Sequence, residues 1–186
     1  MPSRRRADPA PPTVSVLRLG HRAGRDPRLT THLALAARAL GADRLYLHPP
    51  DDALADRVRA VAKTWGGGFE VVGVSEWRRT VLEFPGPVVH LTMYGEPLAR
   101  RLTAMRRARR LLLVVGGAKV PSEIYRTSTW NVAVGHQPHS EVAALAITLD
   151  RVRGLPGPGA WAGAERVVVP QSRGKKVAER RRRSAP

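Results

Sequence analysis

The sequence contains no cysteine, and this absence excludes three kinds of chemistry at once. Disulfide bonds, thiolate nucleophiles and cysteine-based zinc or iron–sulfur centres all need that side chain. Long apolar runs are also missing, since no stretch reaches the roughly 18 residues of a membrane-spanning helix. The first residues, MPSRRRADPAPP, have no apolar segment behind them, so they do not read as a secretory signal. We therefore expect a cytoplasmic protein without membrane contact.

Acidic residues are scarce relative to basic ones. The 186 residues include 32 Lys and Arg against 15 Asp and Glu, which gives a formal net charge of +17. Such an excess indicates a polyanionic partner, above all a nucleic acid. Much of the charge lies near the ends, at 4–6 (RRR) and 173–183 (RGKKVAERRRR). For those runs, solubility or weak non-specific binding explains the composition as well as a dedicated RNA-binding role does.

Apolar strands and amphipathic helices alternate along the middle of the chain. Strands are predicted at 14–19, 44–47, 69–74, 87–91, 111–115 and 131–134. Helices are predicted at about 31–40, with Thr31 as its N-cap, and at 51–65, 75–83, 97–107 and 141–153.

This alternation predicts one α/β domain at 13–153, with a mostly parallel sheet and helices on both faces. A strand that is apolar on both faces, such as LLLVV at 111–115, is typical of the middle of such a sheet. A basic, proline-rich tail is expected at 1–12, and an extension rich in Gly, Pro and Arg at 154–186. Within the extension, 167–169 is a candidate for one extra strand.

Three segments of unusual composition follow strands of the predicted sheet. They read HLTMYG at 90–95, GGAKVP at 116–121 and GHQPHSE at 135–141. Ligands of parallel α/β sheets bind beyond the carboxyl ends of the strands, so the three segments together predict one pocket. The paired glycines let backbone approach a ligand closely, and the helix that Ser140 caps favours an anionic group at its start.

Familiar nucleotide and metal motifs do not fit these segments. The paired glycines lack the GxGxxG frame of dinucleotide-binding proteins, and Lys119 lacks the GxxxxGK[ST] frame of a P-loop. His136 and His139, with Glu141 nearby, invite a zinc interpretation. Their spacing lies in a turn, however, and no further cluster of ligands stands out. We therefore expect no metal, and expect the histidines to contact loop backbone or RNA.

Five segments carry a resemblance to a known family. They are LRLGHR at 17–22, RDPRLTTH at 25–32, HLTMYG at 90–95, VVGGAKVP at 114–121 and GHQPHSEVAALAITLDRV at 135–152. In this order and spacing they closely resemble the archaeal tRNA (cytidine(56)-2′-O)-methyltransferase family of the SPOUT superfamily, over roughly residues 14–153.

The resemblance implies S-adenosylmethionine as the cofactor and the ribose of cytidine 56, in the T loop of tRNA, as the target. It also implies a SPOUT fold with a C-terminal trefoil knot, and a homodimer. Two alternatives stay open at this point: a SPOUT ribose methyltransferase acting on another RNA, such as ribosomal RNA, and a non-catalytic RNA-binding module that kept the fold.

The resemblance further implies site residues. Cofactor contacts are expected at Leu91, Gly116, Gly117, Ala118, Lys119, Val120, Val134, Gly135, His136, Gln137, Pro138, His139, Ser140 and Glu141. The family's glycine loop tends to read GAEKV, whereas GGAKV stands here, so no role for an acidic side chain carries over. Backbone contacts are unaffected by that difference.

The resemblance also places an arginine of the first motif at the target ribose. Arg22, Arg25 and Arg28 all lie in the loop expected after the first strand. Arg28 is the first choice, and His32 is a candidate base. An arginine, with a pKa above about 12, is a poor base, so the expected role is phosphate clamping and polarisation of the hydroxyl. A histidine with an ordinary pKa of about 6.5 suits proton abstraction better. Each of these residues could equally be a contact to the RNA backbone.

Overall fold

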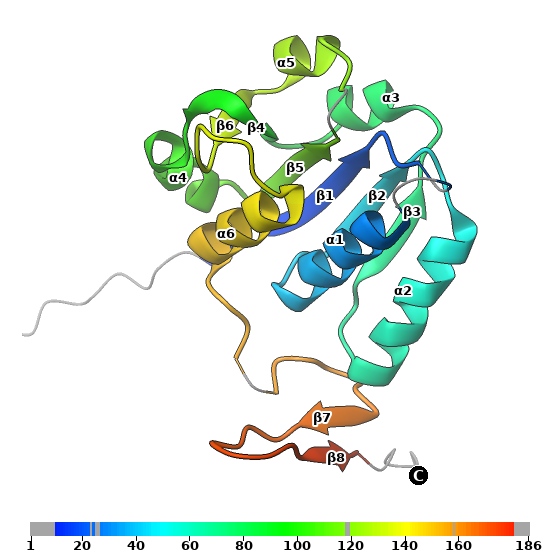
Figure 1. Ribbon diagram of the computed structural model, residues 1–186. Helices are drawn as coiled ribbons and strands as arrows, with labels where there is room; N and C mark the ends of the chain where they lie inside the picture. The colour runs from blue at the N-terminus through cyan, green and yellow to red at the C-terminus, as the bar shows by residue number, and fades with distance from the viewer. Residues whose placement is uncertain (1–9, 23, 25–26, 118–119, 158, 181–186) are drawn as a thin grey trace, which may run out of the picture.

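The structure is a computed structural model that describes residues 10–22, 24, 27–117, 120–157 and 159–180. Over these ranges strands and helices alternate for most of the length, and a short hairpin follows (Figure 1). The elements are β1 (Thr13–Leu19), α1 (Pro27–Ala39), β2 (Arg44–His48), α2 (Asp52–Trp65), β3 (Glu70–Gly73), α3 (Trp77–Leu82), β4 (Val88–Pro97), α4 (Leu98–Arg107), β5 (Arg110–Gly116), α5 (Glu123–Thr127), β6 (Trp130–Ala133), α6 (Glu141–Arg153), β7 (Arg166–Val168) and β8 (Val177–Glu179). Within the described ranges, none of the helices has the length and apolar character to cross a bilayer.

The first six strands form one sheet in the order β3-β2-β1-β5-β4-β6, and every neighbouring pair is parallel. The predicted parallel sheet is therefore confirmed. In this register Leu19, at the end of β1, lies opposite His48 of β2 and Gly116 of β5. The loops that follow β1 and β5 consequently leave the sheet next to each other at its carboxyl edge.

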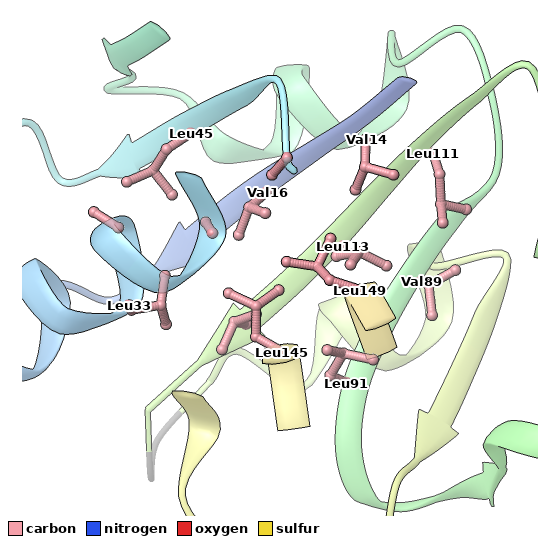
Figure 2. Close-up of a cluster of buried hydrophobic side chains, with 14 of the residues drawn as sticks. Val14, Val16, Leu33, Leu45, Val89, Leu91, Leu111, Leu113, Leu145 and Leu149 are labelled. Carbon is pink, nitrogen blue, oxygen red and sulfur yellow. The ribbon is translucent and has the colours of Figure 1, made fainter. Parts of the chain in front are cut away.

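Helices cover both faces of the sheet, as the composition of β5 predicts. Leu111, Leu113 and Val115 join a core cluster that also contains buried residues of α1, α2, α4 and α6. Leu112 and Val114 point to the opposite face, where α3 and α5 contribute to a second cluster. Figure 2 shows the first cluster, with side chains of α1 and α6 gathered over those of the sheet. Alternate residues of one strand thus serve two apolar layers.

Two predicted boundaries are wrong, and both errors lie near the carboxyl edge. The first helix begins at Pro27 instead of after Thr31, because proline suits the first turn of a helix and adds to it. Thr31 therefore lies within α1 and is not its cap. The HLTMYG segment, expected to be a loop, continues β4 as far as Pro97, and its pairing with β6 shifts register between Leu91 and Glu96. That irregularity accommodates the extra residues without ending the strand.

The extension adds a hairpin that stands apart from the main sheet. The candidate strand at 167–169 is observed at Arg166–Val168, where β7 pairs with β8 in antiparallel fashion. Neither β8 nor the short helix α5 was predicted from the sequence. Figure 1 shows the hairpin near the carboxyl end of α2, beyond the amino ends of the strands.

Candidate active site

A hollow of about 440 Å³ opens at the ends of β5 and β6, beside the middle of β4, where the pairing of β4 with β6 shifts register. Its walls come from the three predicted pocket segments, HLTMYG, GGAKVP and GHQPHSE, together with Tyr125 of α5 and Ala144 of α6. Apolar side chains of the strands, among them Leu91, Val115 and Val132, form one side. The chain exit from β5 and the start of α6 form another. The three segments therefore share one site.

Bare backbone forms the part of the hollow that follows β5. A Cβ atom added at Gly116 would lie 1.9 Å from Cγ1 of Val120, so a side chain at this position would displace Val120. Gly117 has more room, and a Cβ there would make only ordinary contacts with Glu141 and Arg18. Glycine at 116 lets the returning chain cross close to the strand end, which leaves peptide groups accessible beside the hollow.

A buried ion pair fixes the start of α6 against the sheet. Arg18 of β1 is 1% exposed, and its Nη1 donates a hydrogen bond of 2.9 Å to Oε2 of Glu141, which is 24% exposed. Ser140 caps the same helix by accepting a hydrogen bond from the backbone N–H of Val142. Among the described residues, Nε of Arg18 has no hydrogen-bond partner. A charge-assisted bond of this kind holds the helix start in place relative to β1.

A chain of polar side chains fixes the opposite wall. Asn131 donates a 2.8 Å hydrogen bond from its amide to the carbonyl oxygen of Tyr125, so its oxygen is the acceptor for Nδ1 of His90 at 3.0 Å. The His90 and Tyr125 rings meet edge to face at 4.7 Å, and the Tyr125 hydroxyl lies 3.3 Å from that of Thr92. Burial lowers the pKa of His90, which the hydrogen bond to Asn131 opposes, so the imidazole is favoured in its neutral form.

The histidines of the loop between β6 and α6 hold backbone groups. Nε2 of His136 donates to the carbonyl oxygen of Gly95 at 3.1 Å, and Nδ1 of His139 donates to that of Gln137 at 2.8 Å. These bonds are the backbone contacts that we expected in preference to zinc ligation. Over the ranges that the structure describes, no three His, Asp or Glu side chains gather as a metal ion would require.

Most of the residues predicted to contact a cofactor line the hollow. They are Leu91, Gly116, Gly117, Val120, Val134, Pro138, His139, Ser140 and Glu141. Gly135, His136 and Gln137 belong to the same loop but stay outside the lining. Ala118 and Lys119 lie outside the described residues. Because no ligand is present, contact between these residues and a cofactor stays a prediction.

The residues predicted at the ribose are not part of this lining. Arg28 and His32 are exposed on the first turns of α1, and Arg25 lies outside the described residues. His21, which is 2% exposed, anchors the helix: its Nε2 donates to Asp51 at 3.0 Å, and its Nδ1 lies 2.9 Å from the Thr30 hydroxyl. The start of α1 is thereby fixed at the carboxyl edge, beside the hollow but not in it.

Sequence reasoning missed three residues that shape the site: Arg18, His90 and Tyr125. Arg18 had a visible signal, because a charged residue at an alternate position of an apolar strand needs a buried partner. His90 had a weaker one, as a polar residue in the apolar strand PVVHL. Nothing in the composition around Tyr125 indicates a helix that reaches a strand end.

Comparison with known proteins decides what kind of site this is. Residues 65–178 match the family described as tRNA ribose 2′-O-methyltransferase, aTrm56. The chain belongs to this family. A tRNA (cytidine(56)-2′-O)-methyltransferase of Haloarcula marismortui is 49% identical over 172 residues, which cover 90% of this chain and 96% of the relative. Its counterpart from Archaeoglobus fulgidus is 49% identical, covering 88% and 97%. The sequence resemblance and the prediction of a methyl-transferring enzyme are confirmed.

Solved structures agree on the fold. An RNA 2′-O ribose methyltransferase is similar with a TM-score of 0.59 at 17% identity, covering 82% of this chain and 60% of the other. The SpoU methyltransferase AviRb from Streptomyces viridochromogenes, in complex with the cofactor AdoMet, is similar with a TM-score of 0.54 at 20% identity, covering 78% and 57%. This chain therefore spans about three fifths of the length of each. At such identities the likeness establishes the shared fold.

Proposed function

We propose that the protein transfers a methyl group from S-adenosylmethionine to the ribose 2′-hydroxyl of cytidine 56 in tRNA. The observation that carries the proposal is the hollow at the ends of β5 and β6, beside the middle of β4, in a chain of this family. The cytidine target is the one that the names of its relatives state. Residues 13–153 are proposed as the methyltransferase domain, with the trefoil knot that the family resemblance implies.

The residues around the hollow suit S-adenosylmethionine. The apolar side formed by Leu91, Val115 and Val132 suits an adenine ring, and the backbone at Gly116 and Gly117 can hydrogen-bond its edge. The capped start of α6 favours the negative end of the ligand, its carboxylate. When bound, this cofactor supplies an electrophilic methyl group.

The chain's own contribution to the reaction is positioning. The ion pair between Arg18 and Glu141 and the hydrogen-bonded wall around His90 hold two sides of the hollow in fixed relation, as in-line displacement requires. Arg28 clamps a phosphate and polarises the ribose hydroxyl, and His32 accepts its proton. Arg25 is the neighbouring candidate for the phosphate contact.

We propose a homodimer as the working form. The family resemblance supports it, as does Ile147, a large apolar side chain of α6 that is 43% exposed on the helix bordering the hollow. A light-scattering mass of one chain would contradict it. Action on tRNA in the cytoplasm belongs to the same proposal, and cell fractionation tests it.

The decisive experiment maps the methylated nucleotide. Purified protein is incubated with methyl-labelled S-adenosylmethionine and an unmodified tRNA transcript, and the product is digested and sequenced. We expect label at cytidine 56 alone, and none in a matched transcript that carries 2′-deoxycytidine there. Label only in ribosomal RNA would reject the tRNA target. Absence of S-adenosylmethionine binding by calorimetry would reject the enzymatic proposal.

A further inference from the structure

A second hollow, of about 360 Å³, lies between the domain and its extension. Arg38 at the end of α1 and Trp65 at the end of α2 form one side, and residues of the extension, including Trp161 and Arg166, form the other. The volume falls within the roughly 300–1,000 Å³ of pockets that hold small ligands. Both helices end at the amino edge of the sheet. This hollow and the one at the carboxyl edge therefore lie on opposite sides of the domain. Figure 1 shows the last turns of α1 and α2 near the amino ends of the strands.

The extension is firmly seated where it forms this hollow. Gly67 donates its N–H to the carbonyl oxygen of Ala162 at 2.8 Å, and Glu165 donates its N–H to that of Thr64 at 3.0 Å. Gly67 has a φ of +87°, and a Cβ there would lie 2.8 Å from the ring of Trp161. The glycine run after α2 thus serves as the docking place for Trp161. The hollow is a built feature of the fold.

Arg38 brings a buried positive charge to the hollow. It is 7% exposed, its guanidinium lies 5.2 Å from the centre of the Trp161 ring, and it donates to the carbonyl oxygen of Gly66. Among the described residues, no carboxylate pairs with it, and its Nε has no hydrogen-bond partner. A buried cation in this state favours an anionic ligand. Burial also lowers the pKa of Arg38.

An aromatic surface lies beside that charge. Trp65 borders this hollow and the adjoining one, which Lys175 and Lys176 line, and no ring or cation contact engages it among the described residues. Arg166 adds a cation that is about half exposed, and its Nη2 lies 3.9 Å from Oε1 of Glu179, which is itself largely exposed. An aromatic ring next to a guanidinium that has no carboxylate partner among the described residues, with an outer rim of basic residues, is a combination that suits a nucleobase with its phosphate.

From this combination we propose that the hollow binds an unpaired nucleotide of the tRNA substrate, with the base stacked on Trp65 and the phosphate held by Arg38 and Arg166. The inference rests on the proposed function, because it takes tRNA to be the substrate. The 14 residues of α2 rise by about 20 Å between the two edges of the domain. A polymer of the size of tRNA can occupy both hollows at once. This second contact would then govern substrate affinity and not the chemical step.

Two variants of Trp65 test the proposal in the full-length protein. In Trp65→Leu, which keeps an apolar side chain at the end of α2, the KM for unmodified tRNA transcript should rise roughly tenfold, since a stacked base is lost. The kcat at saturating tRNA and the affinity for S-adenosylmethionine should stay at wild-type values. Trp65→Phe keeps a ring and should restore a KM close to that of wild type. Circular dichroism and a thermal melt establish that both variants are folded.

A charge variant provides an independent measurement. Arg166→Gln should reduce the slope of log KM against log salt by nearly one, as loss of one phosphate contact requires, while the matched Arg79→Gln on α3 should not.

A wild-type KM in Trp65→Leu, or a fall in kcat alone, would overturn the inference. So would a light-scattering mass that changes with Trp65, because the hollow would then join two copies. Wild-type protein that methylates cytidine 56 establishes the proposed function whichever result the variants give.

Discussion

Glu141→Gln should destabilise the protein more than Arg18→Met does, although both changes break the same ion pair. The reason is unequal exposure, since 1% of the Arg18 side chain and 24% of the Glu141 side chain are accessible to solvent. A guanidinium stranded in the interior cannot be rehydrated, whereas the Glu141 carboxylate, at the start of α6, is already in contact with water. The cost therefore depends on which partner is left behind.

The magnitudes follow from the same comparison. Loss of one partner from a fully buried pair costs about 3–5 kcal/mol, and the partial exposure of Glu141 together with the acceptor that glutamine retains reduces this to about 2 kcal/mol. Methionine fills most of the space of Arg18, so Arg18→Met should cost about 1 kcal/mol. The double variant should match Arg18→Met, because no stranded guanidinium remains. The double-mutant cycle then yields a coupling energy of about 2 kcal/mol.

Urea denaturation followed by circular dichroism measures these differences, without S-adenosylmethionine so that ligand binding does not contribute. Glu83→Gln is the matched control, because Glu83 pairs with Arg79 where both side chains are largely exposed, and it should change the unfolding free energy by less than about 0.5 kcal/mol. Equal losses in the two single variants, or a coupling energy near zero, would refute the reasoning.

Two other predictions concern Asp51, which caps α2 and contacts His21, and Arg28 of α1. Hydrogen bonds from the backbone N–H of Leu54 and from His21 lower the pKa of Asp51, so its stabilising contribution is present above the ordinary carboxyl pKa and disappears as pH falls through the lowered value. Asp51→Ala should cost about 1 kcal/mol in urea unfolding at pH 7 and progressively less towards pH 2; a constant difference would contradict this. Arg28→Ala should reduce turnover by about 100-fold or more while calorimetry shows unchanged affinity for S-adenosylmethionine, and Arg79→Ala serves as the control. Wild-type turnover would remove Arg28 from the mechanism.

Much of the fold could be predicted because strong local signals agree with it. The apolar run of β5 and the capped, regular helix α6 have boundaries close to those expected, since both are determined by residues near in sequence. β4 was predicted too short because its continuation past Leu91 depends on pairing with β6, about forty residues away. The hairpin of β7 and β8 is likewise defined by where the extension docks, which residue order alone does not state.

The candidate site was predictable in position and less so in composition. A parallel sheet brings the segments after its strands to one edge, so HLTMYG, GGAKVP and GHQPHSE could be assigned to one pocket without coordinates. The wall built by His90, Asn131 and Tyr125 could not be, because the hydrogen bond from His90 to Asn131 spans 41 positions and the ring contact of His90 reaches Tyr125 on a helix with no sequence signal. The roles of Arg28 and His32 could not be predicted to the same extent. Both lie on α1 outside the lining of the hollow, so under the proposed function a second chain or bound RNA brings them to the reaction.

Two buried arginines suggest how the two edges of the domain differ. Arg18, at the carboxyl edge, is paired with Glu141, so the charge that helps to shape the candidate active site is balanced within the chain. Arg38, at the amino edge, is nearly as buried but has only a carbonyl oxygen and the Trp161 ring as partners among the described residues. The first arrangement is complete before substrate arrives and suits a preorganised reaction site. The second becomes electrostatically complete only with an anion, which suits a surface whose task is to hold RNA.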